Sequence, residues 1–307
     1  MKVVVSRKIP GPAVDLLQQQ GYEVVIGADF SGADAILSLL TDKITGEVMD
    51  AAGKQLKIIA NYAVGFDNVD LEAAKQRNIF VTNTPGGFEA SVAEHAIGLL
   101  IAVARKIVSG DAYVRAGKYI RWEPELFLGT ELAKKTIGII GMGRIGSVVA
   151  RIAGAGLGMK VIYHSHGKEN IDAEFVDNLD DLLAKADVVT IHVPLNDETR
   201  HMISKKELSG MKKNAILINT SRGAIVDEEA LCEALSNNWI AGAGLDVFED
   251  ETPIVSPTEK ILHSLSNVVL TPHIGSATVE ARAEMSRTAA ANIIAALSGQ
   301  TPPNLAK

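Results

Sequence analysis

The stretch from residue 136 to residue 146, Thr-Ile-Gly-Ile-Ile-Gly-Met-Gly-Arg-Ile-Gly, constrains the fold of this chain most strongly. Its first half is rich in β-branched residues, which is typical of a strand buried on both faces of a sheet. Three glycines in the pattern G-x-G-x-x-G follow, and after them apolar residues recur at helical spacing over 144–155. A strand, a glycine turn and a helix in this order predict a dinucleotide-binding site.

Each glycine of the turn has its own role in such a site. Gly141 permits a tight turn, Gly143 lets the backbone approach a pyrophosphate, and Gly146 lets the helix pack closely on the strand. The helix start at Arg144 and Ile145 offers unpaired N–H groups and the positive end of the helix dipole to the phosphates. Glycine turns are common, so a plain strand-to-helix turn is the alternative; the flanking pattern favours a cofactor site.

Length and composition restrict the class of protein. The 307 residues exceed one typical domain, so we expect two. A net charge of −7 gives no overall electrostatic attraction to nucleic acid or to an anionic membrane. The longest apolar run, 96–104, is too short to span a bilayer, and the N-terminus resembles a first strand rather than a signal peptide. We therefore expect a soluble, cytoplasmic α/β protein without nucleic-acid or membrane partners.

Two stretches of alternating strands and helices predict two doubly wound parallel sheets, a flavodoxin-like substrate domain and a Rossmann NAD(P)-binding domain. The first stretch predicts strands at 2–6, 22–26, 35–39, 57–61 and 79–82, with helices at 13–20, 45–52 and 70–77. The second predicts six strands, at 136–140, 160–163, 188–193, 215–220, 240–247 and 268–271, with helices at 178–185, 205–211 and 227–236. A long Ala-rich helix over 275–297 can return to the first domain. The predicted boundaries are therefore 1–97 with 284–307 for the substrate domain and 98–283 for the Rossmann domain.

Two segments between these stretches suggest an interface. Residues 91–107 predict one long helix that begins with a capping box of Ser91 and Glu94. This helix is apolar around much of its circumference, which predicts burial between domains or subunits. Residues 109–135 predict a long irregular loop, and a loop of this length usually covers or reaches another domain or subunit. We expect it to contact a partner subunit.

Polar residues follow three predicted strands of the second sheet, where they could meet in one cleft. Arg222, Glu251 and His273 come from these three stretches. An Arg can bind a carboxylate bidentately and polarise the adjacent carbonyl group. A His can donate a proton, and a carboxylate on its other ring nitrogen orients it and stabilises its charged form. Together these groups provide what reduction of a 2-keto acid requires.

With these motifs the chain resembles the D-isomer-specific 2-hydroxyacid dehydrogenases, most closely their glyoxylate/hydroxypyruvate reductase branch, over essentially its whole length. The residues that carry the resemblance are 61–68, 141–146, 221–223, 246–249 and 271–276. The resemblance implies that Arg222 binds and polarises the substrate, that Glu251 pairs with His273, and that His273 is the acid–base group. It also implies that backbone N–H groups of Val64 and Gly65 bind the substrate carboxylate, and that the enzyme is a homodimer.

The resemblance also implies further contacts to the cofactor. Asp246 would lie near the nicotinamide carboxamide, and the turn His192-Val193-Pro194 would line the cofactor cleft. The other candidate cofactor-binding residues are Thr220, Ser221, Gly275, Ser165 and His166. An NAD-specific site has a carboxylate about 20 residues after the glycines, for the ribose 2′-OH. No Asp or Glu occurs over 159–168, so NADP(H) or NAD(H) is predicted, with a preference for NADP(H).

Several alternatives stay open at this stage. Within the family they are phosphoglycerate, phosphite and formate dehydrogenases, although formate dehydrogenase has Gln at the position of Glu251. Outside enzymes, a co-repressor-like protein could keep this fold and bind nucleotide with negligible turnover. Glu249 could replace Glu251 as the partner of His273, because Thr252 separates Glu251 from the Pro253 that usually follows the acid directly.

Three further histidines and the single cysteine are predicted to take no part in binding or catalysis. His95 is predicted to pack within its helix, and His201 and His263 to be solvated. No pair has zinc-ligand spacing supported by Cys or carboxylates, so no metal is expected. Cys232 lies among apolar residues of a predicted helix, where an inert buried thiol is expected.

Overall fold

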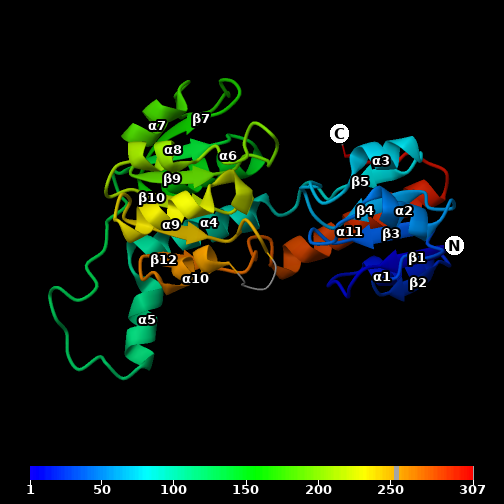
Figure 1. Ribbon diagram of the computed structural model, residues 1–307, viewed down its shortest axis with the longest axis horizontal. Helices are drawn as coiled ribbons and strands as arrows, with labels where there is room; N and C mark the ends of the chain where they lie inside the picture. Colours follow the sequence, from blue (N-terminus) through cyan, green and yellow to red (C-terminus); the bar gives the residue numbers. More distant parts are fainter. Residues whose placement is uncertain (252–255, 307) are drawn as a thin grey trace. The chain divides into compact units, whose positions relative to one another are not determined.

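Two parallel β-sheets form the framework of the protein, each with its own helices (Figure 1). The computed structural model describes residues 1–251 and 256–306. Unit 1 consists of Met1–Phe88 and Ser276–Lys307, and unit 2 of Glu89–Gly275. The predicted class, two doubly wound α/β domains, is confirmed. In the described part of the chain, no helix is both long and apolar enough to cross a membrane.

The sheet of unit 1 has five parallel strands in the order β2-β1-β3-β4-β5, which is the flavodoxin-like order. Its strands are β1 Lys2–Val5, β2 Glu23–Ile26, β3 Ala35–Ser38, β4 Ile58–Asn61 and β5 Phe80–Thr82. Its helices are α1 Ala13–Gln19, α2 Gly46–Ala52, α3 Leu71–Gln76 and α11 Val279–Leu297. Every residue of β3 and β4 is buried, because helices cover both faces of the sheet.

Helix α11 packs on α1 and β4, and it makes unit 1 discontinuous. The Oγ atom of Ser286 accepts a hydrogen bond of 2.8 Å from the backbone N–H of Ala13. The helix begins at Val279 rather than at the predicted Gly275, because Thr278 caps it by accepting from the N–H of Ala281.

The sheet of unit 2 has seven parallel strands in the order β12-β11-β10-β9-β6-β7-β8. Its strands are β6 Thr136–Ile140, β7 Lys160–His164, β8 Glu174–Phe175, β9 Val188–Ile191, β10 Ile216–Asn219, β11 Gly242–Leu245 and β12 Val268–Leu270. Its helices are α4 Glu89–Ala104, α5 Ile107–Arg115, α6 Arg144–Arg151, α7 Leu179–Lys185, α8 Lys205–Gly210, α9 Glu228–Ser236 and α10 Pro257–Ser264, with a π-turn at Ile152–Gly156 and a 3₁₀ turn at Gly223–Ile225. The prediction missed β8, which is too short to show an alternating pattern, and α10.

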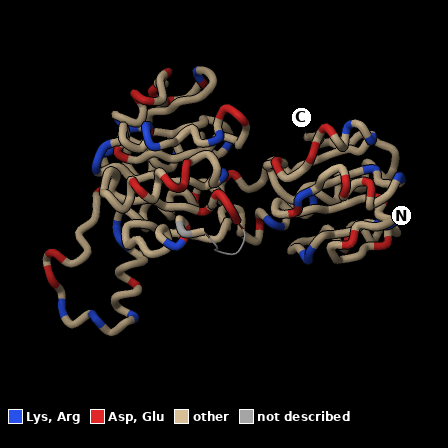
Figure 2. Tube along the Cα trace, in the orientation of Figure 1, with Lys and Arg blue, Asp and Glu red and all other residues tan. Residues whose placement is uncertain are grey.

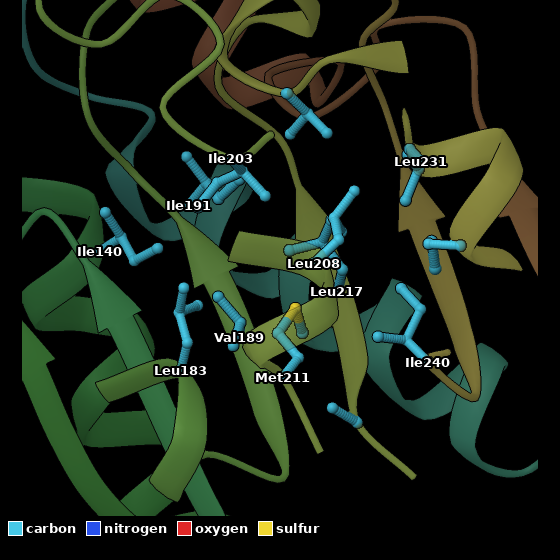
Figure 3. Close-up of a cluster of buried hydrophobic side chains, with 14 of the residues drawn as sticks. Ile140, Leu183, Val189, Ile191, Ile203, Leu208, Met211, Leu217, Leu231 and Ile240 are labelled. Carbon is cyan, nitrogen blue, oxygen red and sulfur yellow. The ribbon is translucent and has the colours of Figure 1, made fainter. Parts of the chain in front are cut away.

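Apolar side chains fill both faces of this sheet. One cluster lies beneath α7, α8 and α9 and includes Ile191, Leu208 and Leu217, all of them fully buried (Figure 3). The opposite face is covered by α4 and α6. A Cβ atom on Gly138 in β6 would lie 2.6 Å from a methyl carbon of Leu182, so a larger residue would push α7 off the sheet.

Helix α4 packs against α6, β10 and β11, so the whole helix belongs to unit 2. The units therefore divide at 88/89 and 275/276, whereas the predicted boundaries are 97/98 and 283/284. The predicted capping box at Ser91 is wrong, because the helix already begins at Glu89 and Ser91 lies in its first turn. The helix ends at Ala104, before the left-handed residue Lys106.

Helix α5 and the loop after it stand away from the rest of unit 2 (Figure 1). The segment was predicted to be irregular, but it begins with this helix, none of whose residues is buried. The loop returns to the body of unit 2 where the N–H of Thr130 donates to the carbonyl oxygen of Ala104, at 2.8 Å. Three basic residues of the segment, Arg115, Lys118 and Arg121, are followed by the acidic Glu123 and Glu125 (Figure 2). The apolar side chains between them are exposed, Ile120 by 91% and Trp122 by 75%.

Candidate active site

The glycine turn lies where β6 ends, and close approaches of the backbone explain two of its glycines. Gly141 has φ +93, and a Cβ atom there would lie 2.7 Å from the carbonyl of His192. A Cβ atom on Gly146 would lie 2.2 Å from the carbonyl oxygen of Gly141, so α6 packs directly onto the turn. Any side chain at these two positions would displace α6 or the loop after β9.

The start of α6 fits a pyrophosphate. Gly143 is its N-cap and makes no side-chain cap, so the first N–H groups of the helix face outward without a capping side chain. Nothing lies within 4 Å of the place of a Cβ atom on Gly143, which leaves the space that a phosphate group needs. The next side chain, Arg144, is 72% exposed and lies 3.9 Å from Glu89. These features match what a dinucleotide cofactor requires.

The loops that follow neighbouring strands of unit 2 contact one another at the carboxyl edge of the sheet. The hydroxyl of Ser221, after β10, donates to the carbonyl oxygen of Val193, after β9. A Cβ atom on Gly223 would lie 1.9 Å from the carbonyl carbon of Phe248, so the loops after β10 and β11 meet backbone to backbone. The candidate residues on these loops therefore share one edge, as the sequence predicts.

His273 and Glu251 form a close pair at this edge. The Nδ1 atom of His273 lies 2.8 Å from Oε1 and 2.9 Å from Oε2 of Glu251. Glu249 instead contacts His201, with 2.7 Å between Oε1 and Nε2. The structure therefore pairs His273 with Glu251 rather than Glu249, and His201, predicted to be merely solvated, has a carboxylate partner. Thr252 and Pro253 lie outside the described residues.

Asp246 accepts hydrogen bonds from three successive N–H groups at His273, and the N–H of His273 also donates to the carbonyl oxygen of Thr271 at 3.1 Å. The N–H of His273 donates to the carbonyl oxygen of Asp246 at 2.8 Å, while those of Ile274 and Gly275 donate to its carboxylate at 2.8 and 2.7 Å. The hydroxyl of Thr271 donates to the same carboxylate at 2.6 Å. His273 has φ +54, a left-handed conformation that costs a non-glycine residue about 1–2 kcal/mol. The contacts to Asp246 offset that cost.

His95, predicted to be a packing residue of its helix, also contacts this network. Its Nε2 atom lies 2.9 Å from Oγ1 of Thr271 and 3.2 Å from Oδ1 of Asp246. Sequence reasoning missed this contact because His95 lies within a helix, and only its packing on β11 and β12 brings it to the strand ends. Burial alone would raise the pKa of Asp246, but its hydrogen bonds, among them those from His95 and Thr271, outweigh burial and lower that pKa.

Arg222 follows β10 in a turn fixed by the buried side chain of Asn219. The Asn219 amide accepts from the N–H of Ser221 at 3.0 Å and donates to the carbonyl oxygen of Arg222 at 2.9 Å. The guanidinium of Arg222 donates to the carbonyl oxygen of Ser221 at 2.8 Å. The hydroxyl oxygen of Thr220 is buried and has no hydrogen-bond partner among the described residues, which fits a residue that binds a ligand.

In unit 1, two contacts orient the peptides of Val64 and Gly65. The N–H of Thr84 donates to the carbonyl oxygen of Ala63 at 2.9 Å, and the Asn83 amide donates to that of Val64 at 2.8 Å. In a planar trans peptide the N–H points opposite to the carbonyl. The N–H groups of Val64 and Gly65 therefore both point away from 83–84, which is the arrangement that a carboxylate can bind.

The segment after β7 lies beside the glycine turn. The N–H of Gly141 donates to the carbonyl oxygen of His164, the last residue of β7, at 2.8 Å. Ser165 and His166 follow directly, and the hydroxyl of the buried Tyr163 accepts from the N–H of Glu169 at 2.8 Å, which closes the loop. The sequence-predicted cofactor-specificity residues are thus adjacent to the predicted phosphate site.

Desolvation shifts the pKa of two further side chains in unit 2, the partly buried His192 and the buried Cys232. Burial lowers the pKa of His192 to about 4, so its ring is neutral and Nε2 contacts Oγ1 of Thr190 at 2.9 Å. Burial also raises the pKa of Cys232 in α9 to about 11, which agrees with the inert thiol predicted for it.

Comparisons with known proteins agree with this geometry. Residues 97–275 match the family described as D-isomer specific 2-hydroxyacid dehydrogenase, NAD binding domain. The chain belongs to this family. A glyoxylate reductase from Thermococcus litoralis is 48% identical over 99% of this chain and 96% of its own length.

Two solved structures resemble this dehydrogenase along its length. A crystal structure of a protein from Thermus thermophilus has a TM-score of 0.94 at 44% identity and covers 100% of both chains. An NADPH-dependent glyoxylate/hydroxypyruvate reductase from Sinorhizobium meliloti, in complex with NADP and malonate, has a TM-score of 0.88 at 34% identity and covers 99% of this chain and 96% of its own. The dehydrogenase is thus a nicotinamide-dependent oxidoreductase that acts on the CH–OH group of a 2-hydroxy acid, as the sequence predicts.

Proposed function

We propose that this dehydrogenase reduces glyoxylate, or a similarly small 2-keto acid such as hydroxypyruvate, to the D-2-hydroxy acid. The 2.8 Å contact between His273 and Glu251 is the observation that carries the proposal, since a proton donor of this reaction needs an imidazole that a carboxylate orients. The glyoxylate reductase from Thermococcus litoralis supports the choice of a small substrate.

Each side chain has a defined task in this reaction. When bound, the reduced nicotinamide supplies the hydride that the carbonyl carbon receives. His273 donates its proton to the carbonyl oxygen, and Glu251 stabilises the imidazolium before transfer. Arg222 binds the substrate carboxylate through its planar guanidinium and polarises the carbonyl group. The N–H groups of Val64 and Gly65 in unit 1 are further donors that a carboxylate can accept from.

We propose a preference for NADP(H) over NAD(H). In this proposal Ser165 donates a hydrogen bond to the 2′-phosphate, and the exposed His166 and Lys168 follow it in the sequence. No carboxylate over 159–168 repels that phosphate. The NADP complex of the relative from Sinorhizobium meliloti supports this preference, and an enzyme that accepts NAD loosely is the competing interpretation.

We also propose that the enzyme is a homodimer. Helix α5 has no buried residue, and the loop after it exposes large apolar side chains. The most exposed are Ile120 at 91%, Trp122 at 75% and Leu128 at 65%. A second copy of the chain would bury these side chains, which water otherwise surrounds at a cost in free energy.

A steady-state assay tests the proposed function. Initial rates with glyoxylate, hydroxypyruvate, pyruvate and 3-phosphohydroxypyruvate, each with NADPH and with NADH, yield kcat/KM for every pair. We expect the highest value for glyoxylate or hydroxypyruvate with NADPH. A clear preference for the phosphorylated acid would favour a phosphoglycerate dehydrogenase. Tight NADPH binding with negligible turnover of every acid would favour the co-repressor-like alternative.

A further inference from the structure

The carboxylate of Asp246 is enclosed by protein donors. The residue is 1% exposed, and its two oxygens accept from Thr271, Ile274 and Gly275 and contact His95. Three of these groups belong to the segment that carries His273, so they tie the carboxylate to that segment. His95 alone comes from another element, helix α4, which packs on β10, β11 and β12.

The distances determine which ring nitrogen of His95 carries the proton. The single hydroxyl hydrogen of Thr271 is committed to Asp246, because their oxygens are 2.6 Å apart and the other acceptor, the carbonyl oxygen of Leu245, is 3.5 Å away. The Thr271 oxygen is then an acceptor toward Nε2 of His95 at 2.9 Å. Nε2 therefore carries a hydrogen, which it donates to Thr271 and shares with Asp246 at 3.2 Å.

Asp246 in turn fixes three successive peptide groups. The N–H groups of residues 273, 274 and 275 all donate to Asp246, the first to its carbonyl oxygen and the others to its carboxylate. These bonds hold His273 at φ +54, the conformation in which its ring meets Glu251. A rotated Asp246 side chain would release the N–H groups of Ile274 and Gly275 together.

We propose that His95 is a positioning residue for the acid–base group His273: from helix α4 it holds the hydroxyl of Thr271 and the carboxylate of Asp246 in the orientation that keeps residues 273–275 in place. Helix α4 is a suitable anchor, because it packs along three strands of the same sheet and does not depend on the loop that it stabilises. The role rests on the proposed function, in which His273 donates the proton.

Two substitutions at position 95 distinguish the effect of losing the N–H donor from the effect of changing the side-chain volume. His95→Gln keeps an N–H donor close to the place of Nε2, whereas His95→Leu keeps the bulk and removes the donor. His201→Leu is a matched control, since it removes another imidazole–carboxylate contact of unit 2, the one to Glu249. Each variant is compared with wild type by thermal unfolding, by kcat and KM for glyoxylate with NADPH, and by the ring resonance of His273 in protein labelled with ¹³C-histidine.

We expect His95→Leu to lower kcat by at least about tenfold while KM for glyoxylate changes by less than about threefold, and to shift or broaden the His273 resonance. His95→Gln should restore both readouts to near wild type, and His201→Leu should leave them unchanged. If His95→Leu does not fold, Thr271→Val, with Thr271→Ser as its control, tests the same network with the same expected pattern.

Wild-type kcat together with an unmoved His273 resonance in folded His95→Leu would overturn the proposal. Equal losses in the Gln and Leu variants would also overturn it, because the donor would then be irrelevant. If the wild-type protein reduces no 2-keto acid, the proposed function fails. The resonance of His273 still reports whether His95 positions it, so the two failures can be told apart.

Discussion

Glu249 contacts His201, with 2.7 Å between Oε1 and Nε2, and is therefore not the carboxylate that pairs with His273. Glu251 contacts His273 and no other described histidine, through distances of 2.8 and 2.9 Å to Nδ1. Two neighbouring carboxylates in the sequence thus serve different imidazoles. The ambiguity between them, which the sequence leaves open, is resolved by the side-chain contacts.

Glu251→Gln therefore tests the proton donor. The amide cannot stabilise an imidazolium as a carboxylate does, so we expect kcat/KM for glyoxylate to fall by about tenfold or more. Glu249→Gln should stay within about threefold of wild type. Steady-state kinetics of both variants check this pair, and the reverse order of effects would assign the proton-donor partner to Glu249.

Arg222→Lys tests substrate binding. Lysine keeps the positive charge but loses the planar fork that binds a carboxylate bidentately. We expect kcat/KM for glyoxylate to fall by about a hundredfold, or about 3 kcal/mol of transition-state stabilisation. The Kd of NADPH, measured by fluorescence titration, should barely change. An unaltered kcat/KM would exclude the assigned role of Arg222.

Ser165→Asp tests the choice of cofactor. The new carboxylate can accept from a ribose 2′-OH and repels a 2′-phosphate, so the preference should reverse in favour of NADH by at least about tenfold. Ser165→Asn is the matched control of similar size without charge, and it should retain the wild-type order. The ratio of kcat/KM with NADPH to kcat/KM with NADH, measured for wild type and both variants, gives the cofactor preference of each. A wild-type enzyme that favours NADH more than about tenfold would contradict the prediction.

His192 should make stability depend on pH. Its pKa is about 4 in the folded protein and 6.5 when free. Between pH 6.5 and pH 4 the His192 imidazole is protonated in the unfolded chain but neutral in the folded protein. The free energy of unfolding therefore falls as the pH falls toward 4. We expect a loss of about 2 kcal/mol between about pH 7.5 and about pH 5. Urea unfolding of wild type and His192→Asn measures it, since the variant should lack this part of the slope.

Trp122→Ser with Ile120→Asp tests the dimer. Removing the apolar side chains of the exposed segment should weaken its association with a second copy, so the double variant should elute as a monomer where wild type elutes as a dimer. Val279→Ser is the control, because Val279 is 83% exposed but lies on α11 in unit 1. Size-exclusion chromatography with light scattering gives the masses. A monomeric wild type would contradict the proposed dimer.

Local sequence signals predicted most elements of the fold. Buried β-branched runs located nearly all the strands. The helix predicted over 70–77 is α3, which Asp70 caps by accepting from the N–H of Ala73 at 2.9 Å. The exceptions are elements whose pattern is too short or too weakly apolar. The strand β8 has two residues, and α5 buries none of its side chains, so neither shows the periodicity on which prediction depends.

The sequence by itself determined the glycine turn, the parallel order of β-strands and helices, and the presence of Arg222 and His273 after strands, because these follow from local backbone preferences and spacing along the chain. Only the tertiary structure decided that Glu251 contacts His273 and that His95 reaches Asp246. Those contacts join residues 22 and 151 positions apart, and they depend on how loops and α4 pack at one edge of a sheet. Spacing along a chain carries no information about which side chains meet there.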